Sequence, residues 1–146
     1  MNKELSNLLN SLFEDIQKLV SDFLNIVEYL KKEVEKTEEK KKESVEEIIK
    51  RVCEEEGVPY KLAYWVAWAE SKLDPYAINV NRDYSLDRGL FQWNSKWHPE
   101  VTNAQAFDPE TATRLFCRAV KQGNLSWWNS SRHLWEPHVK DVLKYL

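Results

Sequence analysis

The first 44 residues contain no glycine, proline, tryptophan or cysteine, and their apolar residues follow a regular spacing. The steps between them alternate between four and three residues, at Leu5, Leu9, Leu12, Ile16, Leu19, Phe23, Ile26 and Leu30. Such a repeat places these side chains along one face of a helix, as in coiled coils. Residues 1–44 are therefore predicted to form an amphipathic or coiled-coil helix that ends in a linker rich in Lys and Glu.

An apolar helix face of this length requires a covering surface. Three interpretations remain open: self-association through residues 5–30, attachment to a larger assembly, and packing onto the following domain. The sequence alone does not distinguish between them.

Residues 45–146 differ in composition, since they hold every Trp, Gly, Pro, Cys and His of the chain. Ser44 and Glu47 form a predicted capping box at the start of a helix. Further helices are predicted from Pro59, from the Asp108-Pro109 pair and from Pro137. The polar segment 76–93 favours short strands or a hairpin. We expect a mainly α domain over residues 45–146, with a small β-hairpin insertion.

Composition excludes several classes of function. The formal charge of −3 does not provide the basic surface that duplex nucleic acids require, and three glycines leave no Gly-rich phosphate loop. No apolar run is long enough to span a membrane. The three histidines lack the spacing of a metal site, so neither metal nor cofactor is expected. Cys53 and Cys117 could pair, although two buried thiols in the helical core are favoured.

The first residues also lack the basic start and short apolar stretch of a signal peptide. Together with the helical arm, this favours a phage or virion-associated protein, or a domain delivered by another machinery. The compartment stays open.

Two carboxyl groups carry the predicted chemistry. Glu70 lies near the end of an apolar helix beside Trp68 and Ala69, where loss of hydration raises a carboxyl pKa and preserves a general acid. Asp87 lies 17 residues further on, in a polar segment that favours an ionised carboxylate. Two carboxyl groups in such contrasting surroundings can act as an acid and its anionic partner in glycoside cleavage. The alternative for Asp87 is a simple turn residue.

The stretch that contains these groups resembles the lysozyme-like superfamily, in particular soluble lytic transglycosylase and lysozyme domains. The resemblance is carried by the pair Glu70-Ser71, the segment 89–92 (Gly-Leu-Phe-Gln), the polar run from Asn79 to Asn94, and the helix start at 106–109. It covers about residues 45–135 and leaves out the arm.

The resemblance implies an α+β lysozyme-like fold and cleavage of the β-1,4 bond between N-acetylmuramic acid and N-acetylglucosamine in peptidoglycan. It assigns Glu70 as the catalytic acid, and Asp87 falls where hydrolytic lysozymes have a second carboxylate. Lytic transglycosylases generally lack that carboxylate and form a 1,6-anhydro product. The Tyr-Asn motif of transglycosylases is replaced here by Trp127-Trp128-Asn129, which favours a muramidase. A third hypothesis is a non-catalytic structural or assembly protein that works through its arm.

The seven tryptophans are too many for one small core. Trp65 is assigned to the core, whereas Trp93, Trp127 and Trp128 are candidate platforms for sugar rings. Ser71, Gln92 and Asn94 complete the predicted substrate-binding set. Ser71 could instead orient Glu70 or end its helix, and contact with substrate or catalytic water is favoured most for Gln92.

Overall fold

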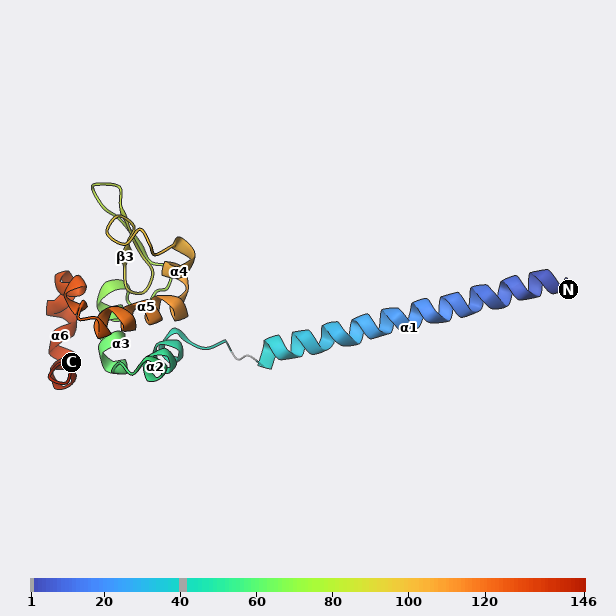
Figure 1. Cartoon of the computed structure of the whole chain (residues 1–146), viewed down its shortest axis with the longest axis horizontal. Coiled ribbons are helices and arrows are strands. Elements are labelled where there is room, and N and C mark those ends of the chain that lie inside the picture. Colours follow the sequence, from blue (N-terminus) through green and yellow to red (C-terminus); the bar gives the residue numbers. More distant parts are fainter. Residues whose placement is uncertain (1, 40–41) are drawn as a thin grey trace. The chain divides into compact units, whose positions relative to one another are not determined.

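The computed structural model describes residues 2–39 and 42–146, and it divides into two compact units, residues 1–42 and 43–146. In the described residues of the first unit, the chain forms one long helix, α1 (Lys3–Glu39), drawn in blue in Figure 1. No helix in the described ranges is long and apolar enough to cross a membrane.

The second unit is mainly helical, which confirms the predicted fold class. Its helices are α2 (Val45–Glu56), α3 (Tyr60–Ser71), α4 (Asn103–Phe107), α5 (Pro109–Lys121) and α6 (Arg132–Leu143), with a 3-10 segment, η1 (Leu125–Ser131), before α6. Helix α2 packs on α5, and α3 packs on α6 (Figure 1). A buried core runs between these helices and includes the Leu90-Phe91 pair.

Local signals in the sequence account for several helix ends. The capping box at Ser44 and Glu47 is confirmed, and Gly57 ends α2 in the left-handed conformation. Asp108 caps α5 through the Thr111 amide, with Pro109 in the first turn.

The prediction for Pro137 is wrong, because α6 begins at Arg132 and Pro137 lies in its interior. Proline removes one helical hydrogen bond, to the carbonyl four residues earlier. Both Pro137 and His133, which carries that carbonyl, are exposed, so water can solvate the carbonyl. Helix α4 and the segment η1 were not predicted.

The β part is a three-stranded antiparallel sheet in the order β1 (Ile78–Val80), β2 (Leu86–Arg88), β3 (Trp93–Asn94). The predicted hairpin corresponds to β1 and β2, and β3 adds a further strand. In its register Asn79 pairs with Asp87, and Asp87 pairs with Asn94. The sheet thus aligns three polar residues in one row across its strands.

Gly89 sets how closely the segment after β2 approaches α4. Its φ is +72°, and a Cβ atom added there would lie 1.9 Å from the Ala106 carbonyl oxygen. No other residue type fits this contact without displacing backbone. The turn at Gly89 sends Leu90 and Phe91 into the core, where Phe91 stacks on Phe116 with ring centroids 4.4 Å apart.

Candidate active site

Glu70 lies in the last turn of α3 and is half-buried. Loss of hydration raises the pKa of its carboxyl group, and the negative charge of Asp87 raises it further. The Ser131 hydroxyl donates a hydrogen bond to Glu70 Oε1 and lowers the pKa in part. The net direction is upward, so Glu70 retains its proton to a higher pH than an ordinary glutamate.

The chain leaves α3 after Ser71 in a left-handed backbone conformation. Lys72 and Leu73 both have positive φ, at 56° and 65°. The Ser71 hydroxyl donates to the carbonyl oxygens of Ala67 at 2.9 Å and Leu90 at 3.0 Å. Ser71 therefore joins the end of α3 to the Leu90 segment, and it is not among the residues that line the cavity described below.

Asp87 lies at the centre of the sheet, where amide side chains hold its carboxylate. Oδ1 accepts a hydrogen bond from Asn94 Nδ2 at 2.7 Å, and Oδ2 accepts from Asn81 Nδ2 at 3.0 Å and Asn79 Nδ2 at 3.3 Å. These donors come from β1, from the loop after it and from β3. The carboxylate is thereby fixed in orientation before any ligand binds.

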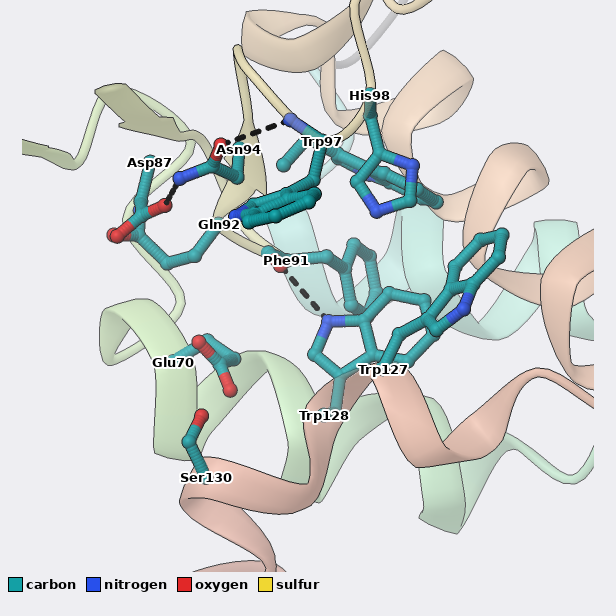
Figure 2. Close-up of a pocket in the computed structure, with 11 residues that line it drawn as sticks. Glu70, Asp87, Phe91, Gln92, Asn94, Trp97, His98, Trp127, Trp128 and Ser130 are labelled. Atoms are coloured by element: carbon teal, nitrogen blue, oxygen red, sulfur yellow. Dashed lines mark hydrogen bonds between the residues drawn. The ribbon is translucent and has the colours of Figure 1, made fainter. Parts of the chain in front are cut away.

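Glu70 and Asp87 line the same cavity, of about 540 Å³. Figure 2 shows Glu70 entering from α3 and Asp87 from the sheet, with an open space beside both. The remaining lining residues are mostly aromatic or amide side chains: Phe91, Gln92, Trp93, Asn94, Trp97, His98, Trp127, Trp128 and Ser130. A cavity of this size, with an aromatic wall and a few polar groups, can enclose a small ligand or a short stretch of a polymer.

The tryptophans of this cavity differ in exposure. Trp127 is 48% exposed and Trp97 is 72% exposed, whereas Trp93 and Trp128 are 4% exposed each. Trp128 donates its indole N–H to the Phe91 carbonyl at 2.9 Å, which fixes it in the cavity floor (Figure 2). Trp97 and Trp127 therefore offer ring surface to a ligand, while Trp93 and Trp128 support the wall from within.

Gln92 and Asn94 both line the cavity, and both also brace the backbone around it. The Gln92 amide donates to the Gly89 carbonyl at 2.9 Å, across a turn in which Gln92 has a φ of 53°. Asn94 Oδ1 accepts from the backbone N–H of Lys96 and Trp97, at 2.9 and 3.1 Å. Asn94 thus connects the Asp87 carboxylate to the loop that carries Trp97.

Sequence reasoning did not assign six residues that contribute to this site: Ser131, Asn79, Asn81, Trp97, His98 and Ser130. Ser131 is 61 residues from Glu70 along the chain, and no local motif marks it. For the two asparagines a signal existed, since they alternate with Asp83, Ser85 and Asp87 in one polar run.

The buried cysteines lie away from this cavity. Cys53 and Cys117 are free thiols between α2 and α5, with their Sγ atoms 3.7 Å apart. Among the described residues, no group of three or more His, Cys, Asp or Glu side chains is placed to hold a metal ion.

A family model described as a lysozyme-like domain matches residues 54–130, which is 77 of the 146 residues. The matched range contains both Glu70 and Asp87 and ends one residue before Ser131. Neither the curated proteins nor the solved structures compared with this chain give a match.

Proposed function

The chain belongs to the lysozyme-like domain family, a family of enzymes that cleave cell-wall glycan, and from this we propose that it is a peptidoglycan muramidase. The bond cleaved would be the β-1,4 linkage between N-acetylmuramic acid and N-acetylglucosamine. One observation carries the proposal: a half-buried Glu70 and an amide-held Asp87 line one cavity.

Glu70 is the proposed general acid. Its raised pKa leaves the carboxyl protonated to a higher pH than an ordinary glutamate, and a protonated carboxyl is what protonation of a departing sugar oxygen requires. The Ser131 hydrogen bond holds Oε1, so Oε2 is the oxygen available to carry the proton to the substrate. After the bond breaks, the carboxylate can act as a base toward a water molecule.

Asp87 is the proposed second carboxylate. Cleavage develops positive charge at the anomeric carbon, and a fixed negative charge beside it lowers the barrier. The three asparagine amides hold the Asp87 oxygens in place before the substrate arrives. Little reorganisation is then required at the moment of reaction.

The aromatic wall would bind the sugar rings. Trp127 and Trp97 expose the ring surface that stacking on a pyranose requires, and they take the platform role in this proposal. The predicted platforms Trp93 and Trp128 contribute through the edges that reach the cavity. Gln92 and Asn94 supply polar groups suited to the N-acetyl and hydroxyl groups of the substrate.

The test is fragment release from purified peptidoglycan, followed by mass spectrometry. We expect the unmodified protein to release hydrolysis products and Glu70→Gln to release at least about 1,000-fold less, as is typical when a catalytic acid is lost. Glu54→Gln is the matched control, because Glu54 is exposed on α2 and outside the cavity. Release should be unchanged in this variant.

Three results would contradict the proposal in different ways. Fragments lighter by one water would identify a transglycosylase that forms the 1,6-anhydro product. Equal release by the unmodified protein and Glu70→Gln would remove Glu70 from the catalytic role. No release from any peptidoglycan would favour a non-catalytic module.

A further inference from the structure

Helix α1 arranges twelve of its apolar side chains in three rows, each with a spacing of seven residues, and Leu8, Leu24 and Tyr29 lie outside these rows. The first row is Leu9, Ile16, Phe23 and Leu30, and the second is Leu5, Leu12, Leu19 and Ile26. These two rows form the seam of the 3.5-residue repeat. A third row, which directly follows the second in the sequence, consists of Phe13, Val20, Val27 and Val34.

The opposite side of the helix is entirely polar. It carries two rows, Ser11, Lys18, Asn25, Lys32 and Glu14, Ser21, Glu28, Glu35. The helix therefore has one apolar side and one side suited to water along its whole length. This division is typical of a helix that is buried on one side only.

The apolar side is uncovered within its own unit, because α1 is accompanied by no second helix among the residues of that unit that the structure describes. The side chains of the first two rows are 50% to 69% exposed. At about 100 Å² of exposed surface each, the twelve side chains of the three rows offer roughly 1,200 Å² per helix, more than the ~800 Å² per partner of a stable interface.

We propose that residues 5–34 of α1 join three or more copies of this chain in a helical bundle. The third row sets the number of helices. A two-stranded coiled coil buries only the first two rows and normally has charged residues at the flanking positions. Here one flanking position is apolar in four successive heptads, which is the wider face required in the core of a bundle.

Chemistry favours a second copy of this chain over a different partner. Coiled coils that select a different partner use charged or polar groups at or beside the seam. Between Leu9 and Leu30 the three rows carry no charged or polar residue. Identical helices meet such a seam apolar side to apolar side, and the charges nearest to it, Asp15 and Asp22, lie on the other flanking row.

The domain formed by residues 43–146 offers no comparable surface of its own. Its exposed large apolar residues are distributed over several segments between residues 76 and 146: Tyr76, Ile78, Val80, Tyr84, Trp97, Trp127, Leu134, Tyr145 and Leu146. The apolar face of α1 extends about 45 Å, at 1.5 Å per residue. These scattered residues do not form a continuous apolar surface as long as the apolar face of α1.

The test is the molar mass of the full chain in solution, measured by light scattering after size-exclusion chromatography at micromolar concentration. We expect at least three times the mass of one chain. Leu19→Lys places a charge in the seam and should give a monomer, with the dissociation constant raised at least 100-fold. Ser21→Lys adds the same charge on the polar side and should leave the mass unchanged.

Val20→Lys tests the third row separately and should reduce the mass to that of a dimer or a monomer. A monomeric or dimeric unmodified chain would overturn the proposal, as would an unchanged mass for Leu19→Lys or Val20→Lys. All seven tryptophans lie in the second unit, so their fluorescence shows whether that domain remains folded in each variant. The mass depends on no catalytic step, so the result is independent of the proposed muramidase activity.

Discussion

Gly89→Ala should destabilise the domain far more than the same change at Gly57. Both glycines have a left-handed backbone, with φ values of +72° and +70°. A Cβ at Gly57 meets nothing within 4 Å, whereas a Cβ at Gly89 lies 1.9 Å from the Ala106 carbonyl oxygen. The two variants therefore share the conformational cost and differ only in the clash.

The shared cost of a left-handed alanine is about 1–2 kcal/mol. Relief of the clash requires the backbone of α4 or of the Gly89 turn to move by about 1 Å, and overpacking of this kind costs a further 1–3 kcal/mol, roughly. We therefore expect a loss of about 1–2 kcal/mol for Gly57→Ala and about 2–5 kcal/mol for Gly89→Ala. The larger loss is a substantial part of the stability of a domain of this size.

Urea unfolding followed by tryptophan fluorescence measures both values in the same assay. Gly123→Ala provides a second reference, because its φ is +82° and a Cβ there also meets open space. Equal losses at the three positions would refute the reasoning, since they would show that the approach of the Gly89 turn to Ala106 has no energetic consequence.

Four further predictions concern the site and the arm. Ser131→Ala removes the hydrogen bond that lowers the pKa of Glu70, so the alkaline limb of the pH–rate profile should move to higher pH and kcat should fall about tenfold; Ser131→Thr should restore both. Trp127→Ala should raise KM for glycan about tenfold with little change in kcat, as measured by initial rates over a range of substrate concentrations. Glu70→Gln should raise the thermal midpoint at pH 7. Burial raises the pKa of Glu70 in the folded protein above its ordinary value, so ionisation of this residue destabilises the fold as the pH rises from the ordinary pKa through the folded pKa. The difference in thermal midpoint between the unmodified protein and Glu70→Gln should therefore vanish below pH ~4. Leu19→Lys should lower activity on insoluble peptidoglycan at least tenfold and leave activity on soluble oligosaccharides unchanged, because only a polymer can engage several joined domains at once.

The features that the sequence predicted well depend on neighbouring residues. The capping box at Ser44 requires only Glu47, and the start of α5 requires only Asp108 and Pro109. The apolar repeat of α1 is likewise a property of one helix. Each of these signals is contained within a few neighbouring residues, so it can be recognised from the sequence alone.

The features that it missed depend on contacts between distant segments. The Ser131–Glu70 hydrogen bond joins residues 61 positions apart and exists because η1 passes the end of α3. The same holds for the burial of Trp93 and Trp128, because Trp128 packs against Phe91 and Phe116 and Trp93 packs against Trp128. Composition predicted aromatic surface near the cleft, but packing decided which rings face it.

The two segments that carry the resemblance to the family are in direct contact in the structure. Glu70-Ser71 and the Gly89–Gln92 segment are separated in the sequence, yet the Ser71 hydroxyl bonds directly to the Leu90 carbonyl, 19 residues away. Gly89 then allows this segment to approach α4, and Asp87 precedes it by two residues on β2. These contacts therefore fix the end of α3, which carries Glu70, relative to the strand that carries Asp87. A motif of this kind encodes the relative position of two carboxyl groups, which explains why Ser71 matters to the site although it does not line the cavity.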